Sequence, residues 1–157
     1  MTTLVDDHVF WMRVALQEAH KAYEKNEVPV GAVVVSDGHV IGRGHNLIES
    51  LQDPTAHAEM LAITAAANTL ATWRLDESIL YVTLEPCMMC AGAILLSRIS
   101  AIVYGAADPR YGACGSKLQI ANSEKLDVRT NIVSGILLEE CSSLMKDFFT
   151  KLRQRSV

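Results

Sequence analysis

The sequence predicts an α/β protein whose five-stranded mixed sheet carries helices on both faces. Two observations lead to this fold class. A β-branched run over 28–35 leads through the turn Ser36-Asp37-Gly38 into a second apolar run over 40–47, which indicates an antiparallel hairpin. From residue 55 onward, helical and strand patterns alternate, which is typical of parallel strands joined by helices.

The remaining elements follow from apolar spacing and flanking turn residues. Apolar side chains recur at helical spacing over 9–23 and predict an amphipathic first helix. The turn Asp53-Pro54-Thr55 opens a helix over 55–70, whose alanine-rich face indicates tight packing on the sheet. Five glycines are interpreted as turn positions rather than phosphate binders: Gly42, Gly44, Gly105, Gly112 and Gly115. We expect further strands over 79–84, 99–104 and 132–136, a helix from Pro86 to about residue 96, a glycine-rich loop over 105–118 and a last helix over 138–153.

Length and composition limit the classes of protein to consider. The 157 residues, 50% of them hydrophobic, predict one domain spanning 1–157 with a sizeable core. No apolar run reaches about 20 residues, so we expect no membrane span. The start over residues 1–7 is short and acidic, unlike a signal peptide. Four cysteines, two of them at a metal-type spacing, fit a reducing cytoplasm better than disulfides.

The charge distribution leaves nucleic-acid binding open. A net charge of −4 is unfavourable overall, but phosphates require local rather than total positive charge. The segment 146–157 supplies it, with four basic residues against one acidic residue. This segment is interpreted either as an RNA contact or as a solvated helix end, where cations also suit the helix dipole.

Two short motifs, His57-Ala58-Glu59 and Pro86-Cys87-Met88-Met89-Cys90, carry the chemistry. One imidazole and two thiols can hold zinc, and catalytic zinc sites keep their fourth position for water. The three-residue spacing of the cysteines puts both sulfurs on one face at the start of a helix, whose dipole favours thiolate. His57 is expected in the first turn of the helix before it. Because residues two apart do not share a helix side, a common pocket for His57 and Glu59 would have to face the open end of that helix.

Glu59 makes the pattern that of a hydrolytic site. Zinc lowers the pKa of bound water, but two thiolates cancel the charge of the ion, so this zinc is expected to be a weaker acid. A neighbouring carboxylate can take the proton from water and pass it to a leaving amine. Two other interpretations are a redox-active CxxC and a structural site completed by Cys114 or Cys141; the joint occurrence of both motifs favours the catalytic one.

At these residues the sequence resembles the zinc-dependent nucleoside and base deaminases, whose signature is H-x-E followed by P-C-x-x-C. Within them it is most similar to the bacterial tRNA-specific adenosine deaminases, because Ser97-Arg98-Ile99, the loop from Gly105 to Asp108 and Phe148-Phe149 match that group. The likeness also covers 26–32, 44–46, 53–59, 80–87, 90–93, 104–106, 135–137 and 140–141. The resemblance implies a three-layer α/β/α cytidine-deaminase-like fold.

The resemblance also implies site roles. His57, Cys87 and Cys90 would hold one Zn²⁺ per subunit, with Glu59 as the proton shuttle. Backbone N–H groups near Cys87 could stabilise the attacking oxygen. The residues expected around the target nucleotide are Asn46 as its hydrogen-bond partner, Val30 and Ala58 beside the flipped base, Asp108 and Arg110 beside the neighbouring nucleotides, and Phe149 as a base or subunit contact.

The function implied is hydrolytic deamination of adenosine to inosine at the wobble position, 34, of a tRNA anticodon. A homodimer acting on an anticodon stem-loop, with tRNA-Arg as the expected tRNA, would follow. A free-base or nucleoside deaminase of the guanine or cytosine type shares the metal motifs but needs neither the long loop from Gly105 nor the basic tail. A zinc-stabilised binding module would instead need a fourth protein ligand, most plausibly Cys114.

Overall fold

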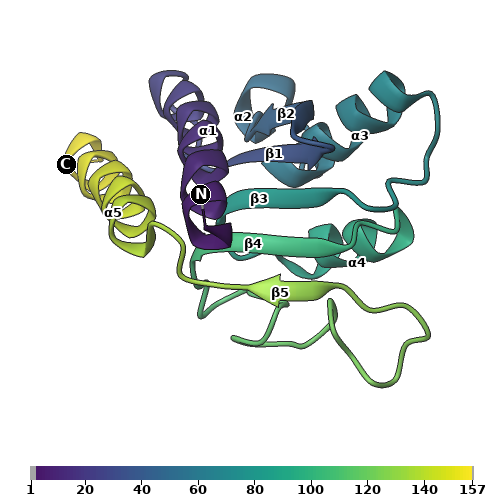
Figure 1. Ribbon diagram of the computed structural model, residues 1–157. Coiled ribbons are helices and arrows are strands. Elements are labelled where there is room, and N and C mark those ends of the chain that lie inside the picture. Colours follow the sequence, from purple (N-terminus) through teal and green to yellow (C-terminus); the bar gives the residue numbers. More distant parts are fainter. Residues whose placement is uncertain (1–2, 157) are drawn as a thin grey trace.

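The computed structural model describes residues 3–156 and confirms the three-layer α/β/α fold with a five-stranded mixed sheet (Figure 1). Its elements are α1 (Leu4–Glu24), β1 (Gly31–Ser36), β2 (His39–His45), α2 (Ile48–Leu51), α3 (Ala58–Leu70), β3 (Ile79–Leu84), α4 (Met88–Leu96), β4 (Ala101–Ala106), β5 (Asn131–Val133) and α5 (Leu138–Arg155). Residues 1, 2 and 157 lie outside the described residues. They include both ends of the predicted domain over 1–157, the first two residues of the acidic start over 1–7, and the last residue of the basic segment over 146–157.

The sheet combines both pairing types. Its strand order is β2-β1-β3-β4-β5, in which β1 pairs antiparallel with β2 and β3, whereas β3, β4 and β5 are parallel. The parallel strands are joined by crossovers, and α4 provides the crossover from β3 to β4. The carboxyl end of β3 therefore leads directly into α4, where the cysteine motif lies.

Alternating side chains of the sheet form two hydrophobic cores. In β1, Val34 points to the core beneath α3 and α4, whereas Val33 points to the core beneath α1 and α5. Figure 1 shows α1 on one side of the sheet and α3 and α4 on the other. Cys141 of α5 packs in the same core as Val33, on the face opposite the one that α3 and α4 cover. None of the helices described from residue 3 to residue 156 combines the length and apolar character that a bilayer span requires.

Several boundaries differ from the predicted ones. Helix α1 begins at Leu4 because Thr3 and Asp6 form a capping box, which the apolar spacing alone did not indicate. Strand β5 is short because it pairs with only Ala101–Val103 of β4. The four-residue helix α2 was not predicted; its backbone N–H groups at Glu49 and Ser50 donate to the buried carboxylate of Glu27.

The prediction of turn positions is wrong for Gly42 and Gly44, which lie within β2, and for Gly105, which lies within β4. A methyl group at Gly44 would overlap the backbone carbonyl of Ala58, and one at Gly42 would overlap that of Ala62. The strand needs glycine there because the α3 backbone lies directly on it. The predicted tight packing of the alanine-rich face of α3 is thereby confirmed.

This close contact predicts that Gly44→Ala destabilises the protein by roughly 1–3 kcal/mol, because α3 must move away from β2. The thermal midpoint of unfolding measures the effect. Ser143→Ala in α5 is the control: Ser143 is exposed and lies outside the described lining of the cavity, and alanine is the better helix former. Equal midpoints for the two variants would contradict the interpretation.

Candidate metal and catalytic site

The N-terminal ends of α3 and α4 meet at the two predicted motifs. His57 is the N-cap of α3 and Cys87 is the N-cap of α4, each with an extended backbone (φ −78°, ψ 151° and φ −74°, ψ 177°). The predicted helix starts at residue 55 and at Pro86 are therefore too early. An N-cap side chain lies at the open end of its helix, so His57 and Glu59 can face one pocket although they are two residues apart.

The local sequence explains these late helix starts. The Asp53 carboxylate accepts hydrogen bonds from the backbone N–H and hydroxyl of Thr55, so a turn occupies the positions before His57. The carbonyl of Pro86 accepts the N–H of Ala113 at 2.8 Å, and the first bond of α4 runs from Ala91 N–H to Cys87 O. Pro86 thus belongs to the segment before the helix.

Three side chains come together as a metal-binding group. His57 Nδ1 lies 3.7 Å from Cys87 Sγ and 3.6 Å from Cys90 Sγ. Ligands of tetrahedral zinc at ordinary bond lengths would place such N and S atoms about 3.6 Å apart, so the three donors fit zinc. Within residues 3–156, this group contains neither Cys114 nor Cys141. Cys141 lies on the opposite face of the sheet, which rules it out as the structural fourth ligand considered above.

The protonation of the group follows from hydrogen bonds and burial. A hydrogen bond from Cys90, opposed by burial and assisted by His57, lowers the pKa of Cys87 to about 4. The same contact and burial raise the pKa of Cys90. Hydrogen bonding to Cys87 raises the pKa of His57. Burial raises the pKa of Glu59, whose side chain is 4% exposed. Without an ion, Cys87 is therefore the thiolate of the pair and Cys90 is the thiol that donates to it.

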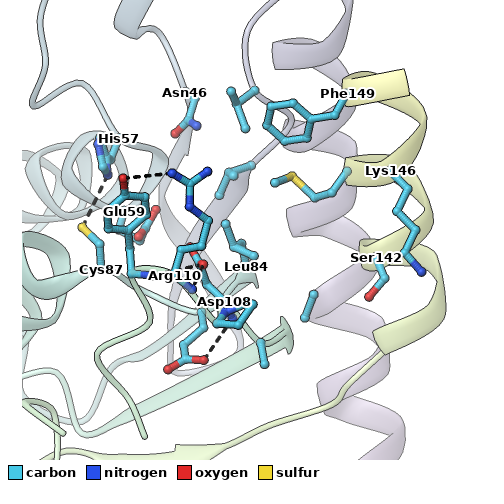
Figure 2. A pocket seen from close by; sticks show the side chains of 18 of the residues that line it. Asn46, His57, Glu59, Leu84, Cys87, Asp108, Arg110, Ser142, Lys146 and Phe149 are labelled. Carbon is cyan, nitrogen blue, oxygen red and sulfur yellow. Dashed lines mark hydrogen bonds between the residues drawn. The ribbon is translucent and has the colours of Figure 1, made fainter. Parts of the chain in front are cut away.

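A cavity of about 1170 Å³ opens over this group (Figure 2). His57, Glu59 and Cys87 lie at one end, and α5 forms the opposite wall, from which Phe149 points inward. The predicted residues that line the cavity are Val30, Asn46, Asp108, Arg110 and Phe149. Their contact with a nucleotide stays a prediction.

The expectation that Ala58 lies beside the target base also stays a prediction. The Ala58 side chain is fully buried against β2 in the core and is absent from the described lining of the cavity. Its backbone N–H donates to Asn46 Oδ1 at 2.9 Å. This bond fixes the Asn46 amide with its oxygen toward α3, so its NH₂ group is left for a ligand in the cavity.

Sequence reasoning missed much of the α5 wall and the buried carboxylate of Glu85. The α5 residues are spaced by one helical turn, a signal that could have identified one face of the helix. They are Ser142, Met145, Lys146, Phe149, Thr150 and Arg153. Tyr111, 53% exposed, also lines the cavity from the loop after β4.

A family model for MafB19-like deaminases matches residues 6–153. The tRNA-specific adenosine deaminase of Bacillus subtilis (strain 168) is 49% identical over 145 residues, which cover 92% of this chain and 90% of the relative. That of Aquifex aeolicus (strain VF5) is 46% identical over 148 residues, covering 94% and 97%. A solved structure from a study of A-to-I editing by tRNA:A34 deaminases superposes with a TM-score of 0.83 at 43% identity, covering 86% of this chain and 98% of that one.

A more distant solved structure, guanine deaminase from Nitrosomonas europaea, has a TM-score of 0.78 at 20% identity and covers 94% of this chain and 85% of that one, which shows the fold alone. The fold and the group of His57, Cys87, Cys90 and Glu59 define a hydrolytic deaminase. Within that class, the chain belongs to the family of tRNA-specific adenosine deaminases.

The three-donor site predicts that His57→Ala loses bound zinc, because two thiolates alone leave the ion without a necessary ligand. Elemental analysis of the purified protein measures the loss. Cys114→Ala is the matched control: like the unchanged protein, it is expected to retain about one zinc per chain. Loss of zinc from the Cys114 variant would support a closed structural site instead.

Proposed function

We propose that this protein hydrolyses adenosine to inosine at the wobble position, 34, of a tRNA anticodon, using one zinc ion held by His57, Cys87 and Cys90. The observation that carries the proposal is the convergence of these three donors with the buried carboxylate of Glu59 at one end of a large cavity. The relatives at 49% and 46% identity are tRNA-specific adenosine deaminases, which supports the substrate class.

When bound, zinc would supply a Lewis acid that activates water for attack on C6 of adenine. Glu59 takes one proton from that water and passes it to N1 of the purine ring. It then moves the second proton from the hydroxyl now on C6 to the amino group, which leaves as ammonia as the C6–N bond breaks. The carboxylate suits this task because it is buried and lies beside the donor group, where bulk water does not compete for its protons.

Other residues orient the adenosine. The NH₂ group of Asn46 donates to the nucleotide, because the amide oxygen is already engaged with Ala58 N–H. Val30 contacts the base from the apolar wall, and the backbone N–H at Cys87 stabilises the developing negative charge on oxygen. An anticodon loop suits such a pocket because its bases are already unstacked, so moving one out costs less than in a duplex.

Cations and an aromatic ring at the mouth of the cavity fit the flanking RNA. Of the basic residues predicted near the C-terminus, Lys146 and Arg153 line the cavity. Lys151 instead pairs with Asp147 at 3.2 Å, and Arg155 donates to Asn26 at 2.8 Å. Asp108 and Arg110 in the loop and Phe149 on α5 would contact the nucleotides beside the target.

The proton-shuttle role predicts that Glu59→Gln retains zinc but loses about 10²–10⁴-fold in turnover, because the amide cannot exchange protons. An anticodon stem-loop of tRNA-Arg with adenosine at position 34 is the substrate, and inosine is detected by sequencing. Free adenosine, cytidine and guanine are the comparison substrates. Undiminished turnover by the Gln variant refutes the shuttle role, and preference for a free base refutes the tRNA assignment.

We further propose that the chain acts as a single-domain homodimer in the cytoplasm, where its tRNA substrate lies. Helix α4 offers a contact surface, because Met88 and Leu96 are 54% and 74% exposed two turns apart on one side of the helix. Gly92 lies between them, and a Cβ added there would meet no atom within 4 Å. Met88 also lines the cavity, so a partner covering α4 would lie close to the bound RNA.

Sedimentation is expected to give a species of twice the 17.2 kDa chain mass. Leu96→Glu should shift it to the monomer, because a charge would be buried in the contact. Phe10→Glu, at a site 58% exposed on the other face of the sheet, is the control and should remain dimeric. A monomeric unchanged protein at working concentration contradicts the proposal.

A further inference from the structure

Glu85 is a buried carboxylate without a role in the proton transfer described above. It follows β3 directly and is 2% exposed. Its Oε1 accepts the backbone N–H of Asp108 at 3.1 Å, and its Oε2 accepts the N–H groups of Cys114 at 3.0 Å and Ser116 at 3.2 Å. The hydroxyl of Ser116 also donates to Oε1. All these donors belong to the loop 107–118. The Glu85 side chain therefore accepts hydrogen bonds from backbone groups near both ends of this loop.

The loop is built around this carboxylate. A methyl group at Gly112 would overlap the carboxyl group of Glu85, so only glycine fits where the loop passes it. The next residue, Ala113, donates to the carbonyl of Pro86 at 2.8 Å. Because Glu85 and Pro86 immediately precede Cys87, these bonds connect the loop to the metal-binding group through two peptide units.

The same loop carries side chains to the mouth of the cavity. Asp108 Oδ1 accepts the backbone N–H of Arg110 at 2.9 Å and of Tyr111 at 3.2 Å, which turns both residues along one side of the loop. The Arg110 guanidinium lies 5.2 Å from the centre of the Tyr111 ring. Figure 2 shows Arg110 reaching across the cavity between Glu59 and Phe149. The Arg110 cation and the exposed Tyr111 ring thus lie together at the cavity, and single-stranded RNA is bound by this combination of positive charge and aromatic stacking.

We propose that Glu85 is a positioning residue, which sets the loop 107–118 at a fixed distance from the metal-binding group and so holds Arg110 and Tyr111 ready for the RNA. The inference rests on the proposed function for its substrate, but the bonds that carry it do not depend on that function. A preset loop lowers the entropy cost of binding, so losing the anchor weakens RNA binding more than it slows the chemical step.

Glu85→Gln tests the anchor with almost no change of shape. Both oxygens of Glu85 accept backbone N–H groups of the loop. In either orientation of the Gln amide, its NH₂ group therefore faces a backbone N–H and cannot accept a hydrogen bond from it. Glu85→Asp keeps the charge on a shorter side chain and should restore part of the lost function. Ser116→Ala removes a single donor and serves if the Gln variant folds poorly. Glu18→Gln is the matched control: this carboxylate is 3% exposed, and its partners Lys21 and His45 lie outside the described lining of the cavity.

Two measurements decide the proposal. Amide hydrogen exchange at 108, 114 and 116 should quicken roughly tenfold or more in Glu85→Gln, but not in Glu18→Gln, while the amides of α3 and zinc content stay unchanged. KM for the stem-loop should rise roughly tenfold with a smaller change in kcat, and Glu85→Asp should recover part of it. The proposal is overturned if amide hydrogen exchange in the loop is unchanged in Glu85→Gln, or if kcat of this variant falls while its KM stays constant. If the unchanged protein does not deaminate the stem-loop, the proposed function fails, whereas the exchange data still decide the anchor.

Discussion

The convergence of two helix N-termini is the constraint on which this structure depends. Helices α3 and α4 each begin one residue after a metal-type side chain, His57 and Cys87 respectively. Both helix dipoles therefore direct their positive ends at one point, where anionic thiolate and carboxylate groups gather. The position of α4 follows from the end of β3, and the position of α3 follows from its contact with the glycines of β2. The sheet thus fixes the site through two independent contacts.

Hydrogen bonds to neighbouring loops complete the site around that point. Asn46 bridges the end of β2 to the first turn of α3, and Glu85 bridges the end of β3 to the loop 107–118. Both are buried polar side chains whose acceptor atoms are occupied by backbone N–H groups. Such bonds would be costly to leave unmade, so they hold flexible segments close to rigid ones. The metal-type group is consequently supported by strands and helices, whereas the loop and α5 line other parts of the same cavity.

The parts of this arrangement that are local in sequence could be predicted. The residue types and spacing of the two motifs indicated the metal group, and the strand over 79–84 was predicted with the observed bounds. The turn at Asp53 was recognised but the helix after it was started too early, and the N-cap at Cys87 was missed because the bond between Pro86 and Ala113 joins segments distant in sequence. Ala58 was expected beside the base from the family resemblance alone, and its side chain packs in the core. The partners of Glu85 lie 23 to 31 residues away in the chain, and no periodicity connects them.

The order in which the chain is synthesised adds a consequence to the position of α5. The ligands at 57, 87 and 90 leave the ribosome well before residues 138–155, which form the far wall of the cavity. The three donors are therefore all present in the nascent chain before the far wall of the cavity is made. A chain terminated before α5 would lack that wall and would also expose the hydrophobic core that Cys141 and Leu144 cover.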